Sequence, residues 1–170
     1  MGFGTGAAEH FAYDWKEGYV YSQSEIGAYI TVIDWCASSV SEYSLDLTSS
    51  GTISEIKDVV VCPEAGLLFM SLADENIVKM YETVKRDSPA PPKFLKDIDA
   101  GTTPDAMRVN DDCTYLAVAN QNEGRDLLTA GAMNLVTDFR GAGGPVVQEV
   151  KYHILFFFLY EILFVCTNEN

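Results

Sequence analysis

Residues 59–81 read VVVCPEAGLLFMSLADENIVKMY, and this stretch decides the fold. Its apolar segments predict three short strands, Val59–Val61, Leu67–Ser71 and Ile77–Tyr81. Proline and glycine mark the first connection, Pro63–Gly66, and polar residues mark the second, Ala73–Asn76, as is typical of tight turns. The stretch therefore predicts three strands that follow one another through two turns.

The same pattern recurs on both sides of this stretch. Downstream, Ala106–Val109 and Thr114–Ala119 flank the polar turn Asn110–Cys113, and Leu116 aligns with Leu68, 48 residues earlier. Upstream, two further strands are predicted at Tyr19–Ser22 and Tyr29–Ile33, and Ile33 aligns with Tyr81 at the same offset of 48 residues. A β-rich unit that repeats every 40–50 residues or so is typical of the blades of a β-propeller.

The sequence thus predicts an all-β fold, a partial β-propeller of about three blades. A period of 48 in 170 residues leaves room for about three units, whereas closed propellers have roughly 4–8 blades, so we expect an incomplete ring. Residues 1–10 are predicted to be a flexible, glycine-rich N-terminus, residues 11–150 to form the blades, and residues 151–170 to be an apolar tail.

Three further segments complete the strand prediction. Tyr43–Leu47 is a strand candidate between the first and second repeats. Lys85–Pro92 contains three of the prolines and is predicted to be a loop between blades, because proline cannot donate a ladder hydrogen bond. Pro145–Val150 is interpreted as the opening strand of another blade.

The segment His153–Cys166 is a dense apolar run of about 14 residues, shorter than the roughly 20 that a membrane helix needs. Three interpretations stay open: a buried closing strand or helix, a membrane-associating tail, or a non-native C-terminus. Any membrane association is expected through this segment alone.

The formal net charge is −14, from 25 acidic and 11 basic residues. This excess argues against nucleic-acid binding, which needs a basic face. It favours a well-hydrated surface or one that meets cations.

Cysteine and histidine limit the chemistry. The cysteines Cys36, Cys62, Cys113 and Cys166 are too far apart for a Cys-x-x-Cys motif, and buried thiols are favoured over disulfides. With two histidines, a three-histidine zinc site is excluded, and no motif of a hydrolase is present. We therefore predict no catalytic residues and no organic cofactor. The first residues lack the basic start and apolar run of a secretory signal.

Carboxylates are concentrated between residues 97 and 126, with asparagines at 110, 120 and 122. Ca²⁺ prefers six to eight oxygen ligands of this kind, although the spacing matches no known calcium loop. Asp111 and Asp112 are also the residues that a hairpin turn uses for its own backbone, and this interpretation is favoured. The candidate metal ligands are Asp105, Asp111, Asp112, Glu123 and Asp126.

Three strings carry a family resemblance: AYDWKEGYVYSQSEIGAYITVIDW (12–35), DIDAGTTPDAMRVNDDCTYLAVANQNEG (97–124) and NLVTDFRGAGGPVVQEV (134–150). They resemble the mesenchyme-specific cell-surface glycoproteins of biomineralising animals and their bacterial relatives, the choice-of-anchor I domain. The resemblance covers residues 11–150. It departs from the family at RDLLTAGAM (125–133) and at residues 151–170.

The resemblance implies a YVTN-like β-propeller at a cell surface or outside the cell, a binding or matrix module without established catalytic residues. It also implies an association with calcium mineral. The partners expected are the extracellular matrix or a mineral surface, and a protein partner or missing blades that close the ring. Two alternatives stay open: a propeller enzyme with its site at the central channel, as in lactonases, phosphatase-associated domains or dehydrogenases, and a truncated fragment or isoform without function.

Overall fold

The computed structural model describes residues 10–23, 29–37, 39–44, 56–121, 132–141 and 143–151. These residues form twelve β-strands and no helix, which confirms the all-β prediction. The strands are β1 (Phe11–Asp14), β2 (Tyr19–Gln23), β3 (Tyr29–Asp34), β4 (Ser39–Ser44), β5 (Ile56–Cys62), β6 (Leu67–Leu72), β7 (Ile77–Glu82), β8 (Lys93–Asp99), β9 (Pro104–Val109), β10 (Tyr115–Asn120), β11 (Ala132–Thr137) and β12 (Val146–Lys151).

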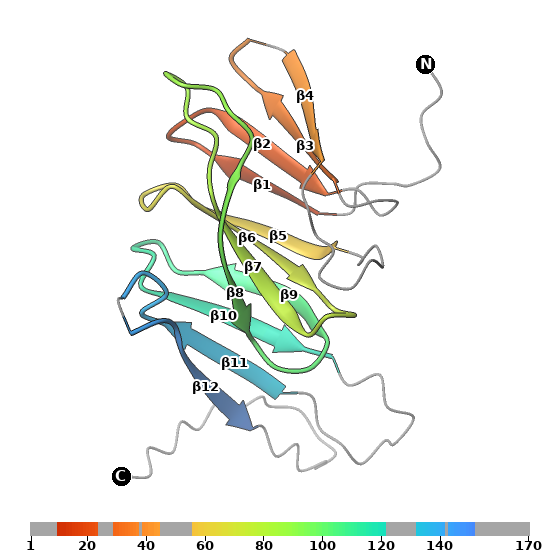
Figure 1. The fold of residues 1–170 in the computed structure, drawn as a ribbon, viewed down its shortest axis with the longest axis vertical. Helices are drawn as coiled ribbons and strands as arrows, with labels where there is room; N and C mark the ends of the chain where they lie inside the picture. The colour runs from red at the N-terminus through yellow and green to blue at the C-terminus, as the bar shows by residue number, and fades with distance from the viewer. Residues whose placement is uncertain are drawn as a thin grey trace, which may run out of the picture.

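The strands are divided among three antiparallel sheets of four strands each (Figure 1). We call β1–β4 blade 1, β5–β8 blade 2 and β9–β12 blade 3, since the sheet order follows the chain within each sheet. The first strands lie together, because β5 packs against β1 on one side and against β9 on the other. This is the arrangement of β-propeller blades around an axis, and the ring is not closed.

The strand register confirms the sequence repeat. In blade 2, Val61 pairs with Leu68, and Leu68 pairs with Tyr81. The positions one repeat earlier pair in the same way, Tyr13 with Val20 and Val20 with Ile33. In blade 3 Val109 pairs with Leu116, again one repeat after the pair in blade 2. Each blade is thus one copy of the same unit.

The hydrophobic core consists of two clusters, one in each space between blades. The first joins side chains of blade 1, such as Tyr21 and Ile30, to one face of blade 2. The second joins the opposite face of blade 2, including Phe69, to blade 3. All six residues of β6 are buried, because blade 2 is covered on both faces. This explains why residues 67–72 lack the alternation of a half-exposed strand.

Three strand predictions need correction. β4 spans residues 39–44, so the candidate at 43–47 was placed too late. β12 pairs with β11 and is the fourth strand of blade 3, and not the opening strand of another blade. The segment 85–92 joins β7 to β8 within blade 2, so it is not a loop between blades. The predicted tail at 153–166 and the N-terminal segment 1–9 lie outside the described residues.

The proline-containing loop at 83–92 has a structural role, since it reaches across to blade 1. The hydroxyl of Tyr21 accepts the N–H of Val84 at 2.9 Å in the core, and burial raises the pKa of this phenol. Nearby, the guanidinium of Arg86 donates to Asp34 Oδ1 at 3.0 Å and to the carbonyl of Glu17 at 2.7 Å. This loop, the clasp, therefore links blade 2 to β2, to the end of β3 and to the β1–β2 turn of blade 1.

We expect Arg86→Ala to lower stability at neutral pH and to have less effect in acid. The side-chain hydrogen bond from Arg86 lowers the pKa of Asp34. A carboxylate with a lowered folded pKa stabilises the fold above its ordinary value, which is 3.8 for Asp34. That contribution is lost as the pH falls through the folded value.

Urea titrations at pH 7 and pH 3 test this expectation. The matched control is Lys93→Ala, whose ammonium lies 3.9 Å from Glu82 with both side chains largely exposed, so that its removal should change little. An equal loss for Arg86→Ala at both pH values would show that the clasp acts without its ion pair.

Among the described residues, no helix is long and apolar enough to span a membrane.

Candidate functional site

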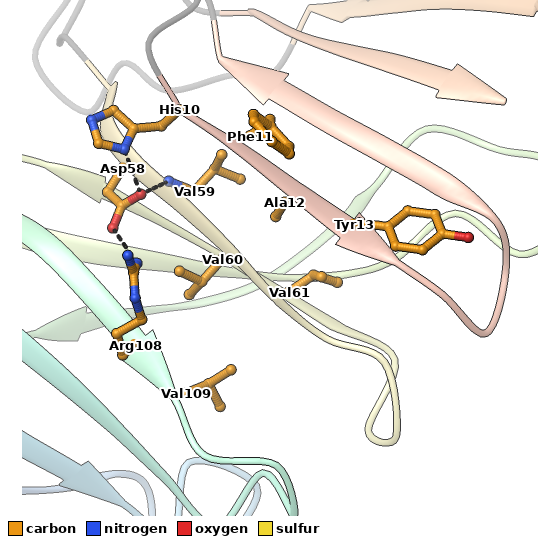
Figure 2. Close-up of a pocket in the computed structure, with 10 residues that line it drawn as sticks. All are labelled: His10, Phe11, Ala12, Tyr13, Asp58, Val59, Val60, Val61, Arg108 and Val109. Carbon is orange, nitrogen blue, oxygen red and sulfur yellow. Dashed lines mark hydrogen bonds and ion pairs between the residues drawn. The ribbon is translucent and has the colours of Figure 1, made fainter. Parts of the chain in front are cut away.

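The inner strands β1, β5 and β9 line a groove, and one end of it is a cavity of about 380 Å³ (Figure 2). Residues from all three blades meet here, because β1 of blade 1 and β9 of blade 3 both lie next to β5 of blade 2. The polar members are His10, Asp58 and Arg108, and the other wall residues are Phe11, Ala12, Tyr13, Val59, Val60, Val61 and Val109.

Asp58 is the centre of this polar group. Its carboxylate is buried on β5, and the residue is 2% exposed. Oδ2 accepts the backbone N–H of Met107 at 2.6 Å, and Oδ1 accepts the N–H of Val59 at 2.8 Å. The bond to Met107 crosses from blade 2 to blade 3, so this carboxylate satisfies a backbone donor between blades.

Two cationic or ionisable groups flank the same carboxylate, as Figure 2 shows. His10 Nδ1 lies 3.3 Å from Asp58 Oδ1, and Arg108 Nη1 lies 3.8 Å from Oδ2. The side chains of His10 and Arg108 are 45% and 83% exposed. The buried carboxylate orients both groups while leaving them open to solvent, so this end of the groove can contact an anion or hold an imidazole in one orientation.

Asp58 was not among the candidate residues predicted from the sequence. A signal was present, since Asp58 is an acidic residue inside the strand Ile56–Cys62, whose other residues are mostly apolar. Positions 10, 58 and 106 are equivalent in the repeat, and His10, Asp58 and Ala106 occupy them. Because these three residues differ, aligning the repeats does not identify position 58 as part of a site.

A second cavity of about 470 Å³ lies at the other end of the groove and shares Tyr13, Val61 and Val109 with the first. We call it the rim cavity, because the turns β1–β2, β5–β6 and β9–β10 surround it. Besides the shared residues, its wall is formed by Trp15, Cys62, Pro63, Glu64, Asn110, Asp111 and Cys113.

Aromatic and acidic side chains give the rim cavity its character. Trp15 is 59% exposed and Tyr13 is 46% exposed. Glu64 is half exposed, and its Oε2 accepts a hydrogen bond from the ammonium of Lys16 at 2.9 Å. This ion pair links the turns of blades 1 and 2. Asp111 is exposed in the β9–β10 turn. An aromatic wall beside carboxylates suits a cationic group.

A disulfide between Cys62 and Cys113 joins blade 2 to blade 3 in the wall of the rim cavity. The prediction of buried thiols was therefore wrong for this pair, and also for Cys36, which is a free and exposed thiol. Cys166 lies outside the described residues. The two half-cystines are 51 residues apart in sequence, and only the stacking of blades brings their Cα atoms to 5.9 Å.

Side-chain oxygens accept backbone N–H groups in the β1–β2 turn and in the β9–β10 turn. The Oδ1 atom of Asp14 accepts the N–H groups of Lys16 and Glu17, each at 3.1 Å. Its equivalent in blade 3, Asn110, accepts from Thr114 at 3.0 Å and Tyr115 at 2.8 Å. Asp111 and Asp112 were predicted to have this role, which Asn110 has instead, one or two residues earlier. In blade 2 the equivalent residue is Cys62, so the disulfide occupies the position of the turn-capping side chain.

The predicted metal ligands are not all brought together. Asp105 lies near the start of β9, whereas Asp111 and Asp112 follow its end. A strand of six residues spans about 20 Å, so these carboxylates cannot share one ion. Glu123 and Asp126 lie outside the described residues, and within those that are described no group of three His, Cys, Asp or Glu side chains is arranged to hold a metal. Calcium binding stays a prediction.

Three four-stranded blades with adjacent inner strands define the class of protein: this chain is a β-propeller module. The family model of the choice-of-anchor I domain matches residues 9–153. The chain therefore belongs to the choice-of-anchor I domain family, as its sequence resemblance implied. Likeness to the mesenchyme-specific glycoproteins is not part of this finding. No curated protein matches the chain.

Solved structures show the same fold at low identity. A putative 6-phosphogluconolactonase from Bacteroides fragilis has a TM-score of 0.62 at 15% identity, over 85% of this chain and 38% of that one. A chain of the nidogen/laminin complex has a TM-score of 0.59 at 12% identity, over 86% and 49%. The β-propeller domain of Cps50 (Swd1) from Myceliophteria thermophila has a TM-score of 0.60 at 10% identity, over 85% and 43%. The chain spans less than half of each.

Proposed function

We propose that this protein is a non-catalytic binding module of the cell surface or the extracellular space, and that its rim cavity binds a cationic group of a matrix component. The observation that carries the proposal is the combination in one cavity of exposed aromatic rings, Tyr13 and Trp15, with the carboxylates of Glu64 and Asp111. Family membership and the disulfide support the location.

The disulfide supports an extracellular setting. Disulfides form and persist in oxidising compartments and are rare in the cytosol. Cys62 is fully buried in the core between blades 2 and 3, so the bond is part of the packing of this domain. Membership of a choice-of-anchor family agrees with a surface protein.

Charge supports a cationic ligand. The chain has a net charge of −14, and the basic residues near the blade 1–blade 2 turns are engaged in contacts between blades. Lys16 binds Glu64, Lys85 lies 3.5 Å from Glu17, and Arg86 binds Asp34. Asp111 is left exposed beside the aromatic wall. Ligands with this chemistry are basic side chains and Ca²⁺, including Ca²⁺ at a mineral surface.

Calorimetric titrations with a lysine-rich peptide and with CaCl₂ test the proposal. We expect peptide binding that weakens about tenfold in Trp15→Ala, because a partly desolvated cation–π contact contributes about 1–2 kcal/mol. Trp35→Ala is the matched control, since Trp35 is 70% exposed and does not line the rim cavity. Asp111→Asn should weaken both ligands, and Asp87→Asn, an exposed acid of the clasp, should weaken neither.

Equal losses in Trp15→Ala and Trp35→Ala would refute the assignment of the site. The absence of heat with either ligand at millimolar concentration would refute cation binding altogether. Heat with CaCl₂ alone would restrict the proposal to calcium or mineral contact.

An enzymatic alternative is favoured by one observation, the imidazole of His10 held at 3.3 Å from the buried Asp58 carboxylate beside Arg108. A carboxylate that orients a histidine is a common device of general-base catalysis. One similar structure is a putative lactonase. Hydrolysis of 6-phosphogluconolactone that His10→Ala abolishes would favour this alternative, and a rate equal to the buffer rate would reject it for that substrate.

A further inference from the structure

A third cavity lies between the outer strands of blade 2 and the β11–β12 loop of blade 3. Its volume is about 460 Å³, within the range of roughly 300–1,000 Å³ for sites that bind small molecules. The β5–β6 turn separates it from the rim cavity, because Pro63 and Glu64 line the rim cavity whereas Ala65 and Gly66 line this one. This turn and the β11–β12 loop lie at the same edge of the molecule (Figure 1). We call the cavity the outer pocket.

The floor of the outer pocket is apolar. Leu67 and Met80 lie on the face of blade 2 that packs against blade 3, and both are buried. Phe139 of the β11–β12 loop completes the floor and packs edge-to-face on Phe69, with the ring centroids 5.3 Å apart. Leu95 of β8 is half-buried against the same cluster. A floor of this kind accepts the apolar part of an organic ligand.

Basic side chains surround this floor, although the chain has 25 acidic residues and only 11 basic ones. They are Lys85 of the clasp, Lys96 of β8 and Arg140 of the β11–β12 loop. The acidic residue that lines the pocket is Glu82, whose carboxylate lies 3.9 Å from the ammonium of Lys93, a residue outside the pocket wall. Three basic residues against one acid give the pocket an excess of positive charge in a protein whose net charge is −14.

Lys96 has an unusual place in the sheet. It is the register partner of Met80 on β7, and Met80 is the partner of Phe69 on β6. Partners in antiparallel strands point to the same face of a sheet, so this row places a lysine on the face that buries Met80 and Phe69 against blade 3. Lys96 is half-buried, and no carboxylate of the described residues pairs with it. A partly desolvated ammonium without an anionic partner favours an anion from solution.

The β5–β6 turn positions the other two basic groups at the pocket. Arg140 Nη2 donates to the carbonyl of Ala65, which uses one of the five N–H donors of the guanidinium. The ammonium of Lys85 lies 2.5 Å from the point that a Cβ at Gly66 would occupy, so glycine makes room for it. Its contact with Glu17 is long, at 3.5 Å. Both basic side chains therefore keep donors for a ligand.

We propose that the outer pocket binds an aromatic ester of phosphate or sulfate, with the ring on the apolar floor and the anionic group between Lys96 and Arg140. The oxygens of such an anion accept charge-assisted hydrogen bonds from lysine and arginine. An aromatic ring fits the floor better than an alkyl chain, because Phe139 and Met80 both form favourable contacts with rings. The proposal does not rest on the cationic ligand of the rim cavity, since the two sites take ligands of opposite charge.

Calorimetric titrations of the 170-residue chain with phenyl phosphate and phenyl sulfate, at pH 7 and low salt, test the proposal. We expect dissociation constants of about 1 mM, as is typical of ligands with roughly ten heavy atoms. Phenol has the ring without the charge, and inorganic phosphate has the charge without the ring, so each should bind at least about tenfold more weakly. Tighter binding of one ester would assign the pocket to that ester.

Charge variants identify the site. Lys96→Gln should weaken both esters about fivefold to tenfold, because it removes the cation that has no partner in the protein. Lys93→Gln is the matched control, since Lys93 lies on the same strand, is 72% exposed and does not line the pocket. Glu82→Gln should tighten binding about twofold, because it removes a repulsive charge from the pocket. A misfolded variant could not give this gain.

Three results would overturn the proposal: no heat with about 5 mM ester, equal losses in Lys96→Gln and Lys93→Gln, or phenol binding as tightly as phenyl phosphate. Variants of the two cavities separate this proposal from the proposed function. Trp15→Ala should leave the binding of phenyl phosphate unchanged, and Lys96→Gln should leave the binding of the lysine-rich peptide unchanged. Each proposal can therefore fail while the other holds.

Discussion

Replacing Asp58 with alanine is expected to lower the free energy of unfolding by about 3 kcal/mol. The substitution removes the acceptor for the backbone N–H groups of Met107 and Val59 and leaves both donors in the core. It also removes the partner of His10 and Arg108. A single side chain joins the inner strands of three blades, so its loss should destabilise both interfaces.

Asp58→Asn is the informative control for this prediction. The amide keeps one oxygen acceptor and about the same volume but loses the charge, so we expect it to recover part of the loss. Urea denaturation followed by circular dichroism gives the free energies of unfolding of the three proteins. A loss below about 0.5 kcal/mol for Asp58→Ala, the usual range of an exposed substitution, would contradict the role of Asp58 between the blades.

Removing the disulfide is expected to lower the free energy of unfolding by about 4 kcal/mol. The bond closes a loop across a sequence separation of 51 residues, and cross-linking the unfolded chain over such a distance removes a corresponding amount of its entropy. The double variant Cys62→Ala, Cys113→Ala is preferred to serine, since Cys62 is fully buried and a hydroxyl there would need a partner.

Reduction of the wild type gives a second measurement of the same quantity. Dithiothreitol should shift the urea midpoint of the wild type toward that of the double variant, and it should not affect the double variant. Cys36→Ser is the matched control, because Cys36 is a free and exposed thiol. A double variant as stable as the wild type would mean that packing alone holds blades 2 and 3 together.

The strands and their repeat could be predicted from the sequence because both are local. Apolar runs before, between and after the turns Pro63–Gly66 and Ala73–Asn76 predicted β5, β6 and β7. The constant offset between repeats then identified their equivalents in the other blades. The blade boundaries could not be predicted, because the fourth strand of each blade lies at its outer edge. β8 and β12 are mostly exposed or half-buried and read as weak strands.

The site could be predicted only in part because its contacts are distant in sequence. The bond from Met107 to Asp58 spans 49 residues, that of Arg86 to Asp34 spans 52, and the disulfide spans 51. Each joins neighbouring blades, and the separation is close to one repeat. Pairs of this kind are expected once the repeat is known, but the choice of Asp58 or Cys62 within a blade depends on side-chain packing.

The most direct test of the account is disulfide mapping of the protein purified from an oxidising compartment. Proteolysis without reduction, followed by mass spectrometry, should give a peptide pair joined through Cys62 and Cys113. That pair would demonstrate the stacking of blades 2 and 3, which brings the two cysteines together. Recovery of Cys62 and Cys113 as separately alkylated thiols would contradict this stacking and remove the disulfide as support for the proposed location.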